Sequence, residues 1–317
     1  MLPVFLVIGC RGQVGWELMR TLQPIGRVVG VDFPEVDLAK PDTILPSLDQ
    51  VRPQVIINAA AYTAVDRAES EPDLAHRING VAPGLLAEEA RRRSAWLMHF
   101  STDYVFDGLA RTPYTEDAEP NPLNVYGCSK AAGDIAIQRV NGRYLIFRLC
   151  WVYGGRGQNF LRTILRLATT RDELRVVNDQ YGCPTWSRLV AEATAHALTR
   201  VLGASNPETL VGVYNLACAG QATWYEFARA IWDAIPTEVR RAIRVVPVTT
   251  EDYPTPARRP AYSVLDCTKL ERVFGLRLLD WRTALSLVLE SAIEGFENVV
   301  LQPRNLVSHG AYSCTRK

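Results

Sequence analysis

Short apolar runs alternate with longer helix-like stretches through the first half of the chain. In the helix-like stretches apolar residues recur with helical spacing, over Gln13–Leu22, Leu74–Arg92 and Val125–Val140. The short runs are rich in β-branched residues, which is typical of parallel strands buried on both faces. They cover Val4–Ile8, Arg27–Val31, Val55–Asn58, Trp96–Phe100 and Tyr144–Leu149. This alternation predicts an α/β fold built on a doubly wound parallel sheet.

The pattern becomes less regular after about residue 150. Thr223 and Glu226 form a capping box, which predicts a helix running to about Ala234. Helical spacing also occurs over Phe160–Thr169, Ser187–Arg200 and Thr283–Glu294. We expect segment 1–150, rejoined by parts of 185–215 and 240–265, to carry the sheet. A smaller mixed α/β lobe would occupy mainly 151–300, and 301–317 would form a flexible tail.

Composition and charge narrow the classes of function. The 317 residues are 48% hydrophobic and 22% charged with a net charge of +1, so neither nucleic acid nor a membrane surface is an expected partner. The seven cysteines form no C-x-x-C pair and the four histidines lack zinc-ligand spacing, which favours reduced thiols in a cytoplasmic protein. The first apolar run stops at Gly9, too early for a signal peptide or a membrane span.

A glycine-rich segment, Gly9-Cys-Arg-Gly12-Gln13-Val14-Gly15, follows the first predicted strand and leads into a helix. Gly9 permits a tight turn, Gly12 lets backbone N–H groups approach a pyrophosphate, and Gly15 lets the helix pack closely on the sheet. The N-terminus of that helix adds partial positive charge toward the phosphates. The segment therefore predicts a dinucleotide site of the Rossmann type, with Gln13 and Val14 in the same turn.

Two residues near this loop give opposite indications of the cofactor. Asp32 follows the second predicted strand, where a carboxylate binds ribose hydroxyls and favours NAD(H). Arg11, inside the loop, is able to pair with a 2′-phosphate and favours NADP(H). The small residues Ala59-Ala60-Ala61 follow the third strand and let a flat cofactor lie against the backbone. We expect segment 1–150 to be a dinucleotide-binding domain that takes NADPH and also uses NADH.

Tyr126 and Lys130 place a phenol and an ammonium four residues apart, on one face of a predicted helix. Reduction of a ketone needs a hydride and a proton, and a free phenol gives up its proton only near pH 10. The charge of Lys130 is expected to lower that pKa and to reach the nicotinamide ribose. Thr102 lies at the carboxyl end of the fourth strand, where its hydroxyl would position a substrate carbonyl beside Tyr126.

Several longer motifs resemble the extended short-chain dehydrogenase/reductases, and within them the dTDP-4-dehydrorhamnose reductases. The similarity spans about residues 4–295. It rests on the glycine loop, Ala61-Tyr-Thr-Ala-Val-Asp66, Ser101-Thr-Asp-Tyr-Val-Phe-Asp-Gly108, Pro122-Leu-Asn-Val-Tyr-Gly-Cys-Ser-Lys130, Trp151-Val-Tyr-Gly154, Asp179-Gln-Tyr-Gly-Cys-Pro-Thr185 and Arg259-Pro260. The resemblance implies NAD(P)H-dependent reduction of the 4-keto group of dTDP-4-dehydro-6-deoxy-L-mannose to dTDP-L-rhamnose, the final step of dTDP-rhamnose biosynthesis.

The resemblance also assigns roles to single residues. It implies that Tyr126 is the proton donor with Lys130 as its partner, that Thr102, Asp103 and Trp151 meet the sugar, and that Asp37 and Leu38 help to hold the dinucleotide. Relatives in this family hold Mg²⁺ at a homodimer contact, for which Glu17 is the candidate here, although one carboxylate makes no site by itself. Independently, Asn159 and Arg259 flank loop motifs on the substrate side, and a guanidinium suits a diphosphate.

Two alternatives to this reductase remain open from the sequence. One is another nucleotide-sugar enzyme of the same fold, a 4-reductase, a 4-epimerase or a 4,6-dehydratase. Dehydratases add an acid/base pair after the threonine, and Tyr104 of the pair Asp103-Tyr104 is a poor substitute for their glutamate. The other is a non-catalytic regulatory subunit similar to the beta subunit of methionine adenosyltransferase, against which the presence of Thr102, Tyr126 and Lys130 argues.

Overall fold

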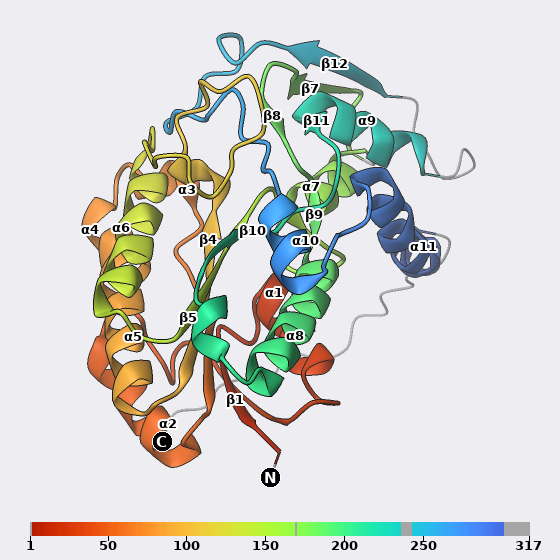
Figure 1. The fold of residues 1–317 in the computed structure, drawn as a ribbon. Helices are drawn as coiled ribbons and strands as arrows, with labels where there is room; N and C mark the ends of the chain where they lie inside the picture. The colour runs from red at the N-terminus through yellow and green to blue at the C-terminus, as the bar shows by residue number, and fades with distance from the viewer. Residues whose placement is uncertain (1, 169, 236–242, 301–317) are drawn as a thin grey trace, which may run out of the picture.

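A parallel sheet of six strands forms the centre of the computed structural model, which describes residues 2–168, 170–235 and 243–300 (Figure 1). Its order is β10-β5-β4-β3-β1-β2. The strands are β1 (Val4–Ile8), β2 (Arg27–Val31), β3 (Val55–Asn58), β4 (Trp96–Thr102), β5 (Tyr144–Leu149) and β10 (Gly212–Asn215). All five predicted strands are confirmed, and so is the doubly wound α/β fold. The strand β10 was not among the predicted ones, because it is a run of only four residues that pairs with β5 far back in the chain.

Helices cover both faces of the sheet (Figure 1). One face carries α1 (Gln13–Thr21), α8 (Ser187–Gly203) and α10 (Thr268–Phe274), and the other carries α2 (Ile44–Val51), α5 (Ala82–Arg92) and α6 (Val125–Val140). Alternate residues of one strand therefore enter different cores: Phe5 and Val7 pack with α1 and α8, whereas Leu6 and Ile8 pack with α2 and α5. Burial on both faces explains why the strands are apolar throughout.

The predicted helix Leu74–Arg92 is interrupted in the structure. It consists of α4 (Pro72–His76), a π-helical turn η2 (Arg77–Val81) and α5. Pro83 has no N–H to give to the carbonyl four residues earlier, and the wider turn accommodates that missing bond. The buried side chain of Asn79, in this turn, bonds the backbone N–H and C=O of Tyr62 and so fixes the loop after β3.

A smaller lobe lies beyond the carboxyl ends of the strands (Figure 1). The predicted capping box is confirmed, because Thr223 Oγ1 accepts from Glu226 N and the Glu226 carboxylate accepts from Thr223 N. Tyr153, Phe227 and Trp281 are fully buried at the centre of this lobe. Its elements are α7 (Phe160–Leu167), α9 (Trp224–Asp233), α11 (Trp281–Val300), and the strand pairs β7 (Glu173–Val177) with β12 (Arg244–Val248), β8 (Tyr181–Gly182) with β11 (Ala222–Thr223), and β6 (Val152–Tyr153) with β9 (Thr185–Trp186).

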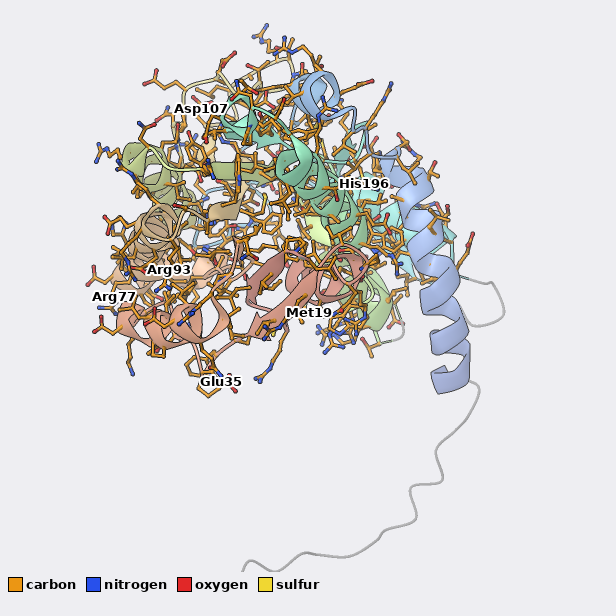
Figure 2. The ribbon with its side chains drawn as sticks, turned by 60° about the horizontal axis from the view of Figure 1, so that its bottom comes forward. Met19, Glu35, Arg77, Arg93, Asp107 and His196 are labelled. Carbon is orange, nitrogen blue, oxygen red and sulfur yellow. The ribbon has the colours of Figure 1, made fainter. Side chains whose placement is uncertain are left out.

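The remaining short helices join these elements. They are η1 (Pro41–Thr43), α3 (Val65–Ala68), η3 (Asp103–Val105) and η4 (Pro207–Leu210). The helix α11 runs along the edge of the molecule in both overall views (Figures 1 and 2). The predicted tail 301–317 lies outside the described residues. Within the part of the chain that the structure describes, no helix is long and apolar enough to cross a membrane.

Candidate active site

A cavity of about 660 Å³ opens where the sheet reverses its strand order, between the carboxyl ends of β1 and β3. Ligands of open α/β sheets bind at such switch points. The smaller lobe closes the far side with Gly157, Gln158 and Trp224. The cavity brings together thirteen of the residues predicted from the sequence: Gly9, Gly12, Gln13, Val14, Asp32, Ala59, Ala60, Ala61, Thr102, Asp103, Tyr126, Lys130 and Trp151.

The glycine loop is shaped to receive a dinucleotide. Gly9 has a φ of +82°, and a Cβ there would lie 2.7 Å from Ala60 N, so a larger residue would push the loop off the end of β3. Gly12 is the N-cap of α1 and offers no side chain to bond the first N–H groups of the helix. Gly12, Gln13 and Val14 line the cavity, where the first N–H groups of a helix are suited to bind a pyrophosphate. The loop therefore fits the cofactor that its sequence predicts.

Asp32 and Arg11 meet at one end of the cavity. The Asp32 carboxylate accepts from Arg11 N at 2.7 Å and from Phe33 N at 2.8 Å, so backbone groups fix its position. The Arg11 guanidinium donates to Phe33 O at 3.1 Å and lies 3.6 Å from the carboxylate of Glu35, at the outer edge of the molecule (Figure 2). The two residues that give opposed indications of the cofactor are therefore in direct contact, through the Arg11 backbone N–H and the Asp32 carboxylate.

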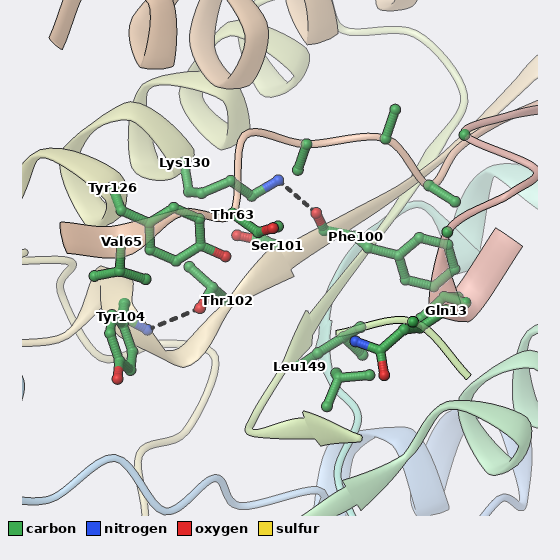
Figure 3. A pocket seen from close by; sticks show the side chains of 18 of the residues that line it. Gln13, Thr63, Val65, Phe100, Ser101, Thr102, Tyr104, Tyr126, Lys130 and Leu149 are labelled. Atoms are coloured by element: carbon green, nitrogen blue, oxygen red, sulfur yellow. Dashed lines mark hydrogen bonds between the residues drawn. The ribbon is translucent and has the colours of Figure 1, made fainter. Parts of the chain in front are cut away.

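Tyr126 and Lys130 project from α6 over the end of β4, next to Thr102 (Figure 3). Asn124 caps α6 by accepting from Gly127 N at 2.8 Å, and its amide also donates to Arg258 O, which ties the start of the helix to a distant loop. Asn124 was not among the predicted site residues, although an asparagine before a helix is a capping signal. This cap sets the position of Tyr126 in the first turn of α6.

The protonation of this pair differs from the sequence-based expectation. Burial raises the pKa of Tyr126 to about 12, and a hydrogen bond with Thr102 offsets only part of that rise. Burial lowers the pKa of Lys130 to about 8, against a smaller opposing effect of Asp134. The ammonium donates to Phe100 O at 2.6 Å, and burial is the largest influence on the pKa of the phenol. Tyr126 consequently keeps its proton at neutral pH.

Asp103 borders the cavity, and its buried carboxylate is held by side chains around it. Its carboxylate accepts from Ser263 Oγ at 2.5 Å, from Cys150 Sγ at 3.1 Å and from Thr102 Oγ1 at 3.1 Å. Burial raises its pKa to about 6, while the three donors lower it. Asp103 therefore positions Thr102 from behind, and the sequence could not show this because Ser263 comes from a loop 160 residues away.

Trp151 lines the cavity in an unusual backbone conformation. Its φ of +44° lies in the left-handed region, which is uncommon for a bulky residue and is typical of functional sites. Gly182 packs so closely that a Cβ there would come within 2.4 Å of the indole. Trp224 stacks on Trp151 with ring centroids 3.5 Å apart and planes 9° apart. Trp224, which was not among the predicted site residues, lines the cavity together with Trp151.

Some predicted site residues lie elsewhere. Arg259 makes a bidentate ion pair with Asp66, with N–O distances of 3.0 and 2.7 Å, and does not line the cavity. Asn159 caps α7 and donates to Gln13 Oε1 at 2.9 Å, so it bridges the lobes beside the cavity. The remaining predicted residues that do not line the cavity are Arg11, Gly15, Asp37 and Leu38.

Glu17 lies on α1, with Arg188 and Glu192 of α8 as charged neighbours. Burial raises its pKa, and its Oε2 atom is buried without a hydrogen-bond partner. Over residues 2–168, 170–235 and 243–300, no group of three or more His, Cys, Asp or Glu side chains is arranged to hold a metal ion. The structure therefore gives no support to the expected Mg²⁺ at Glu17.

Comparison with known proteins matches residues 4–293 to the family described as "RmlD substrate binding domain". A dTDP-4-dehydrorhamnose reductase of Burkholderia thailandensis is 46% identical over 297 residues, which cover 91% of this chain and 98% of the relative. A Clostridium acetobutylicum dTDP-4-dehydrorhamnose reductase structure is 36% identical with a TM-score of 0.83, covering 91% of this chain and 99% of the other. A Bacillus anthracis dTDP-4-dehydrorhamnose reductase in complex with NADP is 32% identical with a TM-score of 0.83, covering 92% and 100%.

Proposed function

This chain belongs to the RmlD family of dTDP-4-dehydrorhamnose reductases, and from that premise we propose that it reduces the 4-keto group of dTDP-4-dehydro-6-deoxy-L-mannose with NAD(P)H. The product would be dTDP-L-rhamnose, and the step the last in its biosynthesis. One observation carries the proposal: the glycine loop, Thr102, Tyr126 and Lys130 line a single cavity. A homodimer and a cytoplasmic location stay predictions.

In the proposed mechanism, a bound nicotinamide supplies the hydride. Tyr126, which holds its phenolic proton at neutral pH, gives that proton to the carbonyl oxygen. Thr102 orients that oxygen by hydrogen bonding, and Asp103 holds Thr102 in turn. Lys130 binds the nicotinamide ribose, and its positive charge stabilises the phenolate that remains after the transfer. Trp151 and Trp224 form the wall beside the sugar ring.

The direct test supplies the purified protein with dTDP-4-dehydro-6-deoxy-L-mannose and either NADPH or NADH. We expect oxidation of the cofactor in proportion to substrate consumed, with dTDP-L-rhamnose as the sugar identified by NMR. A product with the opposite configuration at C4 would show that the hydride reaches the other face of the carbonyl and that the chain makes a different dTDP-sugar. Conversion without net oxidation of cofactor would indicate an epimerase, and an inert protein that captures an adenosyltransferase catalytic chain would indicate a regulatory subunit.

Substitution of Arg11 tests cofactor choice. Arg11→Ser is expected to weaken NADPH by roughly tenfold more than NADH, about 1–2 kcal/mol, which is the value of one charge-assisted contact to the 2′-phosphate. Cofactor affinities are measured by fluorescence titration. Glu35→Gln is the matched control, because it frees the guanidinium from its ion pair and should leave NADPH binding equal or tighter. Equal losses of affinity for both cofactors in Arg11→Ser would show that Arg11 does not contact the 2′-phosphate.

Substitution of the tryptophan pair tests the sugar wall. Trp151→Ala is expected to raise the substrate KM by about tenfold with NADPH affinity unchanged, because the indole meets the sugar and not the cofactor. Trp224→Ala should raise KM less, since it removes the ring that supports Trp151. Both are followed by steady-state kinetics and thermal unfolding. Normal kinetics with a loss of several kcal/mol in stability would show that the pair serves only as core.

A further inference from the structure

A buried histidine next to the active site has no part in the mechanism described above. His99 lies on β4 with 1% of its surface exposed, between Asn58 of β3 and Lys130 of α6, which are equally buried. Its Nε2 atom is 3.1 Å from Lys130 Nζ, and its Nδ1 atom is 3.1 Å from the amide nitrogen of Asn58. A buried polar group without a hydrogen-bond partner destabilises the fold, so each of these groups must find one.

The contacts fix the charge of the ring. An imidazolium has an N–H on both nitrogens and would point one of them at the Lys130 ammonium, which only donates. Burial and then the charge of Lys130 hold the pKa of His99 well below its usual range, in agreement with this geometry. His99 is therefore a neutral ring with a single lone pair, and two groups compete for it.

The lone pair forms the stronger hydrogen bond with the ammonium. A charge-assisted hydrogen bond is about twice as strong as a neutral one, so the lone pair belongs on Nε2 and the proton on Nδ1. With the proton on Nδ1, the Asn58 amide would have to turn its oxygen to this N–H, in place of the nitrogen that lies there in the structure. That turn gives up the bond from Ala60 N to Asn58 Oδ1, which at 3.3 Å is the longest in the network.

We propose that neutral His99 is a positioning residue, which holds the Lys130 ammonium at the end of β4 and keeps it protonated for the reaction. With Phe100 O at 2.6 Å, His99 supplies the second fixed acceptor for Lys130. The ammonium has three donors, so one N–H stays available for the nicotinamide ribose. The proposal rests on the proposed function, since it assumes that Lys130 binds the cofactor.

Other charged groups around Lys130 do not replace this role. Asp134 lies one turn further along α6 and influences Lys130 through its charge. Its carboxylate accepts from Ser101 Oγ at 2.7 Å and faces Arg148 of β5 at 3.6 Å, so its charge is shared. Tyr126, the remaining titratable group of α6 in the cavity, keeps its proton at neutral pH. The neutral acceptors on β4 therefore set the direction of the ammonium.

The experiment measures NADPH affinity across pH 6 to 10, which requires no turnover. We expect wild-type affinity to fall as the pH rises through about 8, where Lys130 loses its proton. In His99→Phe the ammonium loses an acceptor, which should shift this fall downward by about one pH unit and weaken NADPH roughly fivefold at pH 8. His99→Gln restores an acceptor at the position of Nε2 and should restore most of the shift. Met98→Leu, its neighbour on β4, controls for disturbed packing.

A shift in His99→Phe that Met98→Leu reproduces, or that His99→Gln does not reverse, would overturn the proposal in favour of a packing role. A second measurement needs no variant: ¹⁵N NMR of the wild type should find the proton of His99 on Nδ1, and a proton on Nε2 would also overturn it. If NADPH binds with the expected pH dependence but the nucleotide sugar is not reduced, the proposed function fails and the role of His99 stands.

Discussion

Tyr126→Phe is expected to lower kcat by about a hundredfold or more, because it removes the proposed proton donor and keeps the ring. General acid catalysis contributes roughly 10²–10⁴ to a rate. The phenol has the protonation state that reduction requires, since burial raises its pKa to about 12 and it enters the reaction with its proton in place. The ring packs edge to face against Tyr104, with centroids 5.9 Å apart, and phenylalanine preserves that contact. NADPH affinity and the melting temperature should therefore barely change.

Tyr104→Phe is the matched control for this prediction. Tyr104 also lines the cavity, but burial raises its pKa further, and its phenol bonds the Arg259 guanidinium. We expect this variant to keep most of its turnover. Stopped-flow measurement of NADPH oxidation under single-turnover conditions isolates the chemical step. If Tyr126→Phe retains its turnover and Tyr104→Phe loses it, then Tyr104 is the proton donor and the proposed mechanism is wrong.

Lys130→Met is expected to reduce kcat/KM by about two to three orders of magnitude, combining a weaker acid with weaker cofactor binding. Methionine fills a similar volume but leaves Phe100 O and His99 without their donor. NADPH Kd should rise by about tenfold, the value of one charge-assisted bond to the ribose. Tyr126→Phe should leave that Kd unchanged, so the pair of variants separates loss of the acid from loss of the cofactor contact.

The pH dependence gives this prediction a second measurement. Burial lowers the pKa of Lys130 to about 8, so the cation is present below that pH and is lost as the pH rises through it. The kcat/KM of the wild type, which reports the free enzyme, should therefore fall on the alkaline side of about pH 8. Lys130→Met has no ammonium to titrate, and its low activity should lack this limb. If the fall in kcat/KM above pH 8 persists unchanged in the variant, it belongs to the titration of a group other than Lys130.

The sequence alone determined the elements that depend on near neighbours in the chain. The five strands, the helix that carries Tyr126 and Lys130, and the capping box of α9 all follow from hydrophobic period and local polar signals, and the structure has each of them. The glycine loop was equally readable, because the turn after β1 and the helix behind it are consecutive in sequence. Backbone geometry over such short spans is set by the residues themselves, so the pattern suffices.

Tertiary structure alone decided which polar groups pair. Arg259 reads as a diphosphate ligand in the sequence, but the fold brings it to Asp66 across 193 residues and closes a bidentate pair there. The direction of the Asp103 carboxylate and the stacking of Trp224 on Trp151 likewise depend on loops that meet only after the two lobes form. The role of His99 could not be predicted for the same reason. A histidine inside an apolar strand gives no local signal, and its partner Lys130 lies on α6, 31 residues further along the chain. No local pattern encodes such partners, because a side chain takes whichever complementary group the packed cores leave within reach.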